Sequence, residues 1–577
     1  MRTNILSLVS LLAILAIGGF GAAGASSPHF YPDDPIAQEP EPQDASRAAF
    51  NEQDMLYELT YNSFALPRRQ PSGVAAQNTN TIDEVPDSSW FTNRVGSRPV
   101  TVDEIVRGPN IGEPPDPSRW VISREKSAGG KPGVTAVDAK GEMWFLEFDP
   151  PYYPEAATAS ALMATKFFWG AGYNVVESFL TTFDPKRMEI DPEAKFKRPN
   201  GKRTRATRQD IEQLLERAAR NPDGTYRVVA GRLIPGRILG KFRYEGTRPD
   251  DPNDLVPHQH RRELRGLFVF GAWTNMTDFK AANTMDTLLR ENGRTVVKHY
   301  LQDVGSTFGV ANDIHQHDLG WEHFIQGGSA MKRIGTFGFA LPPWATIRYT
   351  ASGPSIGNFE GDHFEPREWR THTPNAATIE MRDDDAFWAA RRIAAFTEEM
   401  IRAIIHTGEF SDPAAEKALG DVMLKRRDKI LRTYLPAINP IVTPRLSNNR
   451  LTFANAAEDA DVAHAPELYR ASWFQFDNAT GDSRPLSETS SPTTTIDAPG
   501  DLPTAAGTYV LVEISADSKE HPAWQRPIRA YFRADAGGWT LVGLKRMPDG
   551  PPAATAQLPA GMNARTERLL ERRRARR

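Results

Sequence analysis

The 577-residue chain contains no cysteine. Disulfide bonds, thiolate zinc sites, cysteine nucleophiles and lipid attachment through cysteine are therefore excluded. If such a chain is exported, it relies on its hydrophobic core alone, which fits a large domain in a bacterial envelope better than an animal extracellular space. Hydrophobic residues make up 40% of the sequence and charged residues 25%, so a sizeable core is possible.

The chain also lacks a strong excess of one charge, since its formal net charge is −4. A nearly balanced charge gives no reason to expect nucleic acid as a partner. Only residues 549–577 carry a clear excess of positive charge, because arginines are frequent from Arg565 to Arg577. We interpret this segment as a solvated basic tail, with contact to an anionic lipid or polymer as the alternative.

Only one apolar run stands out. Ile5 to Ile17 follows the positively charged Arg2 and precedes the small residues Ala23-Gly24-Ala25. This pattern predicts a signal peptide over residues 1–25, with a retained membrane anchor as the alternative. No second stretch approaches the length that spans a bilayer. We therefore expect an exported protein, periplasmic or extracellular, with no membrane span after signal removal.

Composition and periodicity divide the rest of the chain into five parts. Residues 26–105 are rich in Pro, Asp, Asn and Gln and predict an extended arm with little regular structure, wrapped on the main domain. Residues 106–235 predict the order strand, Gly-rich turn, strand, strand, helix, strand, helix, strand. Residues 236–440 are mostly helical, residues 445–548 form a small β domain, and residues 549–577 are the basic tail.

Several elements of these parts are specific enough to test. A helix is expected from Pro154 to Trp169, a buried helix from Arg261 to Trp273, and one amphipathic helix from Ala386 to Ile405. In the β domain, Asp535 to Gly538 is typical of a hairpin turn. Ser487 to Pro499 is rich in Ser, Thr and Pro and is expected to be a turn region.

The most informative stretch is T-D-F-K-A-A-N, Thr277 to Asn283, followed by D-V-G at Asp303 to Gly305. Asp278, Lys280 and Asn283 have the spacing D-x-K-x-x-N, directly after the expected buried helix. The segment between the two motifs is long enough for one β-hairpin. Each motif alone is common by chance, but their order and separation are more specific.

These residue types suit phosphoryl transfer, which needs an in-line acceptor hydroxyl, a divalent metal ion on the phosphates and cations beside the developing charge. Asp278 can orient or deprotonate the hydroxyl, and Lys280 can neutralise the transferring phosphate. Asn283 and Asp303 can hold the metal, because Mg²⁺ prefers one or two carboxylates plus phosphate oxygens. Gly305 lets the backbone turn sharply.

The order of motifs resembles the protein-kinase-like superfamily, in one of its divergent branches. The phrases R-P-D-D-P-N-D (248–254) and H-x-H-R-R-E-L-R-G (258–266) are also similar to uncharacterised exported bacterial proteins. The resemblance covers about residues 120–434. It implies an α+β fold, with a two-lobed kinase-like domain followed by the small all-β domain, and it implies ATP and Mg²⁺ as cofactors.

Carried over residue by residue, the resemblance implies a role for each motif residue. Asp278 would be the catalytic base and Lys280 its phosphate partner, while Asn283 and Asp303 would bind the metal. The phosphate-covering loop and the helix glutamate would be built from Lys126, Gly129, Gly130, Lys131, Gly133 and Glu155.

One departure concerns the lysine that, in kinases, ends the third strand and contacts the nucleotide phosphates. Here that strand is M-W-F-L-E-F-D, Met143 to Asp149, and Glu147 falls at the lysine position. A carboxylate there repels phosphates, and it repels Glu155 unless a metal ion or a cation lies between them. Lys126 or Lys131 could reach in from the Gly-rich turn instead.

Other segments give weaker signals. Asn275 stands where a His or Tyr often supports the catalytic Asp. Zinc or another divalent ion could bind a histidine-rich segment, although an exposed loop is the simpler interpretation; its residues are His315, His317, Asp318, Glu322 and His323. Calcium could bind Asp250, Asp251 and Asp254, although the neighbouring prolines indicate a rigid turn. His258 and His260 are expected to be capping or surface residues.

Two hypotheses follow. The first is an ATP- and Mg²⁺-dependent phosphotransferase acting on an envelope protein or a small hydroxyl substrate. The second is a catalytically degenerate kinase fold, a pseudokinase that acts as a binding or scaffold protein of the cell envelope. In either case nucleotide is the expected ligand of the first domain, and a protein or glycan is the expected partner of the β domain.

Overall fold

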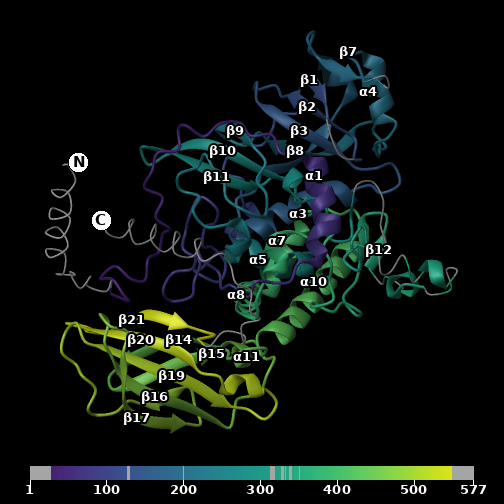
Figure 1. Cartoon of the computed structure of the whole chain (residues 1–577). Coiled ribbons are helices and arrows are strands. Elements are labelled where there is room, and N and C mark those ends of the chain that lie inside the picture. Colours follow the sequence, from purple (N-terminus) through teal and green to yellow (C-terminus); the bar gives the residue numbers. More distant parts are fainter. Residues whose placement is uncertain are drawn as a thin grey trace, which may run out of the picture.

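The computed structural model describes residues 28–126, 130–198, 201–311, 319–325 and 351–548, with parts of 331–349. The predicted signal peptide and basic tail lie outside these ranges. In Figure 1 one sheet lies at the top of the molecule, helices fill the middle and a second group of strands lies at the bottom. Within the described ranges, no helix has both the length and the apolar character to cross a bilayer.

The first region is a six-stranded sheet in the order β4-β8-β3-β2-β1-β5. Its strands alternate, so that Trp144, Leu146 and Phe148 of β3 are buried on one face while Glu147 lies on the other. Helix α3 packs against β3, β4 and β8. The bounds are β1 Trp120–Glu125, β2 Gly133–Val137, β3 Met143–Phe148, α3 Ala156–Ala171, β4 Ser178–Phe183, β5 Met188–Ile190, β6 Lys195–Lys197, β7 Arg203–Arg205, α4 Arg208–Leu215 and β8 Tyr226–Arg232.

The middle region carries the helices around a small three-stranded sheet in the order β11-β10-β9. Helix α5, the expected buried helix, packs against α7, α8 and α10. The bounds are β9 Arg237–Gly240, α5 Arg262–Thr274, β10 Thr284–Glu291, β11 Arg294–Leu301, β12 Ala351–Gly353, β13 Ile356–Phe359, α7 Ala376–Ile379, α8 Asp383–Ala394, α9 Glu398–His406 and α10 Pro413–Tyr434.

The single helix expected from 386 to 405 is wrong, because the chain forms α8 and α9 with a break between them. Helix α8 ends with a C-cap at Ala395, and Thr397 begins α9 as its N-cap, with its side chain accepting the N–H of Met400. Both halves have apolar faces, so the periodicity runs through the break. Thr397, a residue type favoured at the N-cap, is the local signal for this break, and the continuous apolar periodicity hides it.

The last region contains a five-stranded sheet in the order β17-β16-β19-β20-β21 and a three-stranded sheet in the order β14-β15-β18. The hairpin at Asp535 to Gly538 forms as expected, since these two residues pair. The turn region expected from Ser487 to Pro499 is wrong, because it contains strand residues of β17 and β18. The bounds are β14 Ile441–Ser447, β15 Arg450–Asn455, α11 Ala456–Asp459, β16 Leu468–Phe476, β17 Ser483–Ser491, β18 Thr495–Asp497, β19 Tyr509–Asp517, β20 Ile528–Asp535 and β21 Gly538–Lys545.

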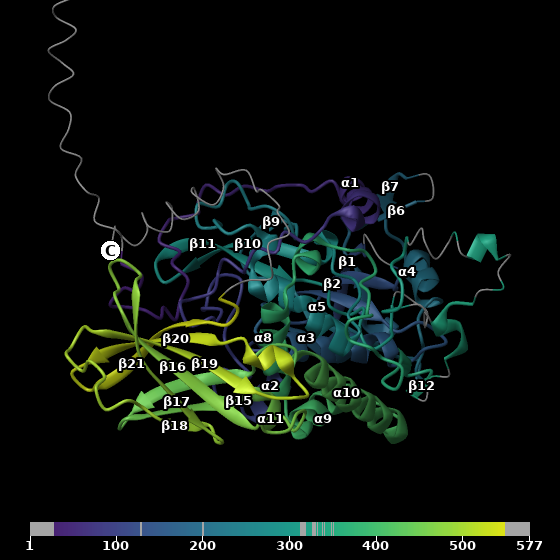
Figure 2. The ribbon, with the colours of Figure 1, turned by 60° about the horizontal axis from the view of Figure 1, so that its bottom comes forward.

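The β strands share one continuous hydrophobic core with the helices, and Figure 2 shows them side by side. The buried Arg546, directly after β21, strengthens this junction. Its guanidinium lies over the ring of Phe387 in α8 and is 3.4 Å from the carboxylate of Asp83 in the arm. The β strands are therefore packed into the main body rather than attached by a free linker.

The arm follows the surface of all three regions, as the purple chain in Figure 1 shows. Phe30 packs against Phe476 and Tyr531 of the β strands, and Trp90 stacks on His299 of β11 with ring centroids 3.5 Å apart. Regular structure is short, as expected, and consists mainly of α1 (Met55–Thr60), which continues into a π turn, and α2 (Val102–Arg107).

Three buried arginines at the start of α5 connect the arm to the helices. Arg262 lies 2.6 Å from Asp83 of the arm and 3.1 Å from Asp385 of α8. Arg265 lies 3.0 Å from the other oxygen of Asp385, and Arg261 lies 3.0 Å from Glu39 of the arm. Burying these guanidinium groups is tolerable only because each has a carboxylate partner.

Replacement of Asp385 tests this dependence. We expect Asp385→Ala to lower the free energy of unfolding by about 3–5 kcal/mol, since it leaves two buried guanidinium groups short of a partner. The matched control is Asp383→Ala in the same helical turn, which removes an exposed ion pair with Arg367 and should cost less than about 1 kcal/mol. Denaturant unfolding of both variants measures the difference, and equal losses would contradict this account.

Candidate functional site

The loop after α5 holds the first part of the candidate site. Helix α5 ends at Thr274, and Asn275 caps it in the left-handed conformation with φ 56°. The Asn275 side-chain oxygen accepts a hydrogen bond from the indole N–H of Trp369 at 2.8 Å, so this residue helps to hold the start of the loop in place. Asp278 and Lys280 follow, and their carboxylate and ammonium groups form an ion pair at 2.9 Å.

The hairpin β10–β11 returns the chain to this loop. Thr284 pairs with Leu301 at the open end of the hairpin, and Asn292 and Gly293 turn its far end with positive φ. The residues next to the open end are therefore Asn283 and Asp303. The backbone N–H of Asp303 donates to the carbonyl of Asn283 at 3.2 Å, so the two expected metal ligands are neighbours.

Asn283 and Asp303 each retain an oxygen suitable for a cation. The Asn283 amide nitrogen donates to the carbonyl of Asp278 at 2.9 Å, which leaves its side-chain oxygen without a hydrogen bond from any described residue. One carboxylate oxygen of Asp303 accepts the N–H of Gly305 at 3.0 Å, and the other accepts none from the described part of the chain. This pair of oxygens fits Mg²⁺, which takes its remaining ligands from phosphates and water.

The pKa of Asp303 is set by opposing effects of the atoms around it. Its side chain is exposed, yet surrounding protein atoms desolvate it, which by itself raises the pKa. The ammonium of Lys131, the Gly305 N–H and the ammonium groups of Lys126 and Lys280 outweigh this effect and hold the Asp303 pKa below its ordinary value. Asp303 is therefore kept ionised.

Lys131 reaches the site from the Gly-rich turn. It is buried, and its ammonium lies 3.5 Å from the carbonyl of Gly305. Lys126, at the start of the same turn, forms an ion pair at 2.5 Å with Glu147 of β3. Glu147 therefore has a cation beside it, which removes the repulsion expected at this position.

Two of the three glycines of the turn lie in the described part of the chain. Gly129 lies outside the described residues. The carbonyl of Gly130 accepts a hydrogen bond from Arg217 at 3.1 Å. A Cβ atom on Gly133 would lie 2.8 Å from the carbonyl of Leu146 across the β2–β3 pair, so only glycine allows this close approach of strands.

The expected pairing of Glu155 with a lysine does not occur among the described residues. Glu155 lies just before α3 in the left-handed conformation, and its carboxylate accepts the N–H of Ser411 at 3.1 Å. The first turn of α3 is held instead by Asp149, which accepts the N–H groups of Ala157 and Thr158. Glu155 is therefore turned away from Glu147 and the lysines.

Lys241 is a member of the site that the sequence did not reveal. Its ammonium donates to the side chain of Gln302, the residue before Asp303. Burial lowers the Lys241 pKa to about 8, and the nearby Asp303 carboxylate opposes that shift. It lies directly after β9, far from either motif in sequence, so no spacing rule pointed to it.

The alternative metal sites receive no support from the described residues, among which no group of three or more His, Asp or Glu side chains converges on a metal position. His315, His317 and Asp318 lie outside the described residues, while Glu322 pairs with Arg333 and His323 contacts the carbonyl of Thr371.

The carboxylates considered as calcium ligands form structural ion pairs instead. Asp254 pairs with His258 at 2.8 Å, and Asp250 pairs with Arg248 at 2.9 Å. His258 and His260 are buried, so a surface role for them is wrong. His260 accepts a hydrogen bond from Arg265, and burial followed by that guanidinium lowers the His260 pKa to about 4.

No protein-family model and no curated protein sequence matches the chain. Among solved structures, the Helicobacter pylori proinflammatory kinase CtkA is 12% identical, with 53% of this chain and 89% of that chain covered and a TM-score of 0.28. The Golgi casein kinase is 11% identical, with 70% and 94% covered and a TM-score of 0.29; its Mn/ADP-bound form is 11% identical, with 69% and 96% covered and a TM-score of 0.27. At such TM-scores the likeness is partial, so the geometry of the site has to carry the functional conclusion.

The pH dependence of metal binding tests the role of Lys131. A metal ligand has to be ionised, and Lys131 helps to keep the Asp303 pKa low, so its removal raises that pKa. We expect Mn²⁺ binding to Lys131→Met, followed by electron paramagnetic resonance without nucleotide, to be lost at a higher pH than in the unmodified protein as pH falls. The control is Lys140→Met, at an exposed turn. An unchanged pH midpoint in Lys131→Met would contradict this role.

Proposed function

We propose that the chain is a nucleotide- and Mg²⁺-dependent phosphotransferase of the kinase type. One observation supports the proposal: the N–H of Asp303 donates to the carbonyl of Asn283. The backbone thus brings a residue with an ionised carboxylate next to a residue whose side-chain oxygen accepts no hydrogen bond from the described residues. The Asp278–Lys280 pair belongs to the same loop, one turn away from Asn283. These are the groups that phosphoryl transfer requires.

Each residue has a defined task in this proposal. Asn283 and Asp303 hold the metal, which supplies charge neutralisation on the phosphate oxygens when bound. Asp278 orients the acceptor hydroxyl and accepts its proton. One oxygen of Asp278 is buried without a hydrogen-bond partner among the described residues, so it is free to accept one. Lys280, paired with the other oxygen, stabilises the charge on the transferring group.

The phosphate-gripping lysine is Lys131 rather than a residue of β3. Lys131 lies beside Asp303 and Gly305, where a metal-bound phosphate would be placed. Lys126 is held by Glu147 and contributes less, because its charge is already matched. Lys241 adds a second cation near Asp303, since its ammonium donates to Gln302 and interacts with the Asp303 carboxylate.

We place this activity outside the cytoplasm because residues 1–25 have the pattern of a signal peptide and the chain contains no cysteine. The acceptor is an envelope protein or a small hydroxyl compound. ATP is scarce outside the bacterial cytoplasm, so the phosphate donor is an experimental variable, and several nucleoside triphosphates belong in each assay.

A catalytically degenerate fold is the second candidate, and two observations favour it. Glu147 occupies the position of the strand lysine, and Glu155 is turned away from the site. If these changes abolished nucleotide binding, the protein would serve as a binding or scaffold protein.

The decisive experiment compares two isosteric replacements. We expect Mg²⁺ with ATP to raise the melting temperature of the full chain, and Asp303→Asn to abolish that rise because it removes the charged metal ligand. Asp278→Asn should keep the rise but lower the rate of phosphoryl transfer by about 10²–10⁴-fold. Thermal shift and phosphate-transfer assays measure the two effects separately.

Asp501→Asn, an exposed residue in the β domain, is the matched control and should change neither result. If no nucleoside triphosphate shifts the melting temperature with any divalent ion, the phosphotransferase proposal fails and the degenerate fold is favoured.

The two lysines of the Gly-rich turn give a further prediction. Lys131→Ala should weaken nucleotide binding by about 1.5–3 kcal/mol, the range for a hydrogen bond to a charged group. Lys126→Ala should cost less than about 1 kcal/mol, since it removes a partly exposed ion pair with Glu147. Calorimetric titration of both variants gives the loss of binding free energy for each lysine. A larger loss for Lys126→Ala would show that Lys126, and not Lys131, contacts the phosphates.

A further inference from the structure

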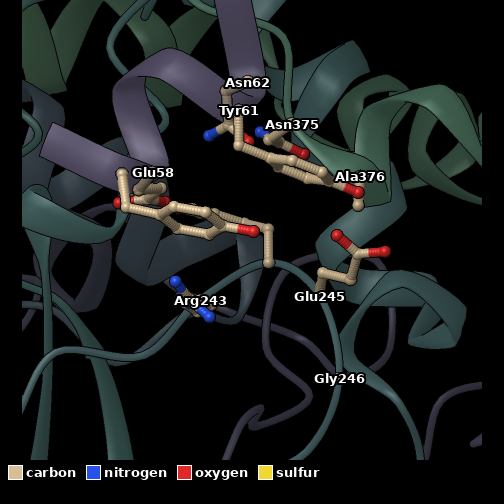
Figure 3. Close-up of a pocket in the computed structure, with 10 residues that line it drawn as sticks. Glu58, Tyr61, Asn62, Arg243, Glu245, Gly246, Asn375 and Ala376 are labelled. Atoms are coloured by element: carbon tan, nitrogen blue, oxygen red, sulfur yellow. The ribbon is translucent and has the colours of Figure 1, made fainter. Parts of the chain in front are cut away.

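A cavity of about 390 Å³ lies beside the loop of the candidate site, and the arm builds one part of its wall (Figure 3). Glu58, Tyr61 and Asn62 line it from α1 and the turn that follows. Arg243 to Gly246 line it from the chain after β9, and Asn375 and Ala376 line it from the start of α7. Its volume suits a small ligand of one or two rings.

The cavity shares a wall with the loop that carries Asp278. The carboxylate of Glu58 accepts the N–H of Ala281 at 3.1 Å, and the side chain of Asn375 donates to the carbonyl of Phe279 at 3.3 Å. Tyr244 lines the cavity, and its pKa is raised by burial and then by the carboxylates of Glu58 and Asp278. The cavity therefore adjoins the loop that carries Asp278.

The lining combines flat aromatic faces with hydrogen-bonding groups. Tyr57 and Tyr61 are stacked with ring centroids 6.0 Å apart, and the Arg243 guanidinium lies over the Tyr57 ring. Glu245 is neutralised by its ion pair with Arg69. Arg243 makes no ion pair or hydrogen bond through its guanidinium with any other described residue, so it is available to a ligand.

This lining matches a polyhydroxylated ring better than a bare ion. Aromatic faces cover the apolar C–H face of such a ring, while carboxylate, amide and guanidinium groups pair with its hydroxyls. Opposite charges at Glu58 and Arg243 offset each other, so neither a strong anion nor a strong cation is favoured.

We propose that the cavity binds a pyranose unit and presents one of its hydroxyls to Asp278. This inference rests on the proposed function, since the sugar is the acceptor. The hydroxyl oxygen forms a bond to the terminal phosphorus of the nucleoside triphosphate, and the bond from that phosphorus to the bridging oxygen breaks. The hydroxyl proton passes to Asp278, and the nucleoside diphosphate leaves with the bonding electrons.

The test is sugar binding in the absence of nucleotide. Saturation-transfer NMR on the full chain with the methyl pyranosides of glucose, galactose, mannose and N-acetylglucosamine should detect binding of at least one. Tyr57→Ala should weaken that binding roughly 2- to 12-fold, the equivalent of one aromatic contact. Tyr57 is 55% exposed, so the replacement leaves the fold intact, and a melting curve verifies this.

Tyr152→Ala is the matched control, because Tyr152 is 84% exposed and is not part of the cavity lining. The proposal is overturned if no pyranoside binds, if both variants bind alike, or if a serine-containing peptide binds through Tyr57 in place of a sugar. Sugar binding by a chain that binds no nucleotide would overturn the phosphotransferase function and still support the assignment of the cavity.

Discussion

The buried arginines at the start of α5 are the constraint on which the site depends. Arg261, Arg262 and Arg265 lie within one turn of helix, and their charges are matched by carboxylates from the arm and from α8. Such a network permits little movement, since a displaced partner leaves a buried charge uncompensated. The orientation of α5 is thereby set, and with it the position at which the chain leaves the helix to form the loop at Asp278.

The arm takes part in several of the long-range connections around this helix. Asp83 binds both Arg262 and the Arg546 that follows the last β strand, so one carboxylate joins three regions. Further along the same arm, Glu58 accepts a hydrogen bond from the loop at Ala281. A segment with almost no regular structure is thus ordered by pairing with charges and aromatic rings, and it builds one wall of the cavity beside the site.

The sequence predicts well what depends on neighbours in the chain. The approach of Asn283 to Asp303 follows from a hairpin of predictable length, and the strands around the Gly-rich turn follow from alternation. The pairing expected for Glu155 could not be judged from the sequence, because tertiary contacts decide that Asp149 holds the first turn of α3 and that Glu155 contacts Ser411. Lys241 and the cavity could not be found, since they join segments about 60 to 185 residues away in sequence, as the contacts of Lys241 with Gln302 and of Tyr61 with Glu245 illustrate.

The charges around Asp303 are compatible with the proposed binding of a metal–nucleotide complex, although Glu147 lies in the third strand. Glu147 is offset by Lys126, and Asp278 is offset by Lys280. Two lysines near Asp303 remain, Lys131 and Lys241, and the Asp303 carboxylate offsets one of their two positive charges. The net charge of these groups is therefore one positive charge. A nucleoside triphosphate with one divalent ion remains a net anion, so it suits a site with this balance. In the proposed function the cation therefore comes from the Gly-rich turn rather than from the third strand, and the charge of Glu147 is matched by Lys126.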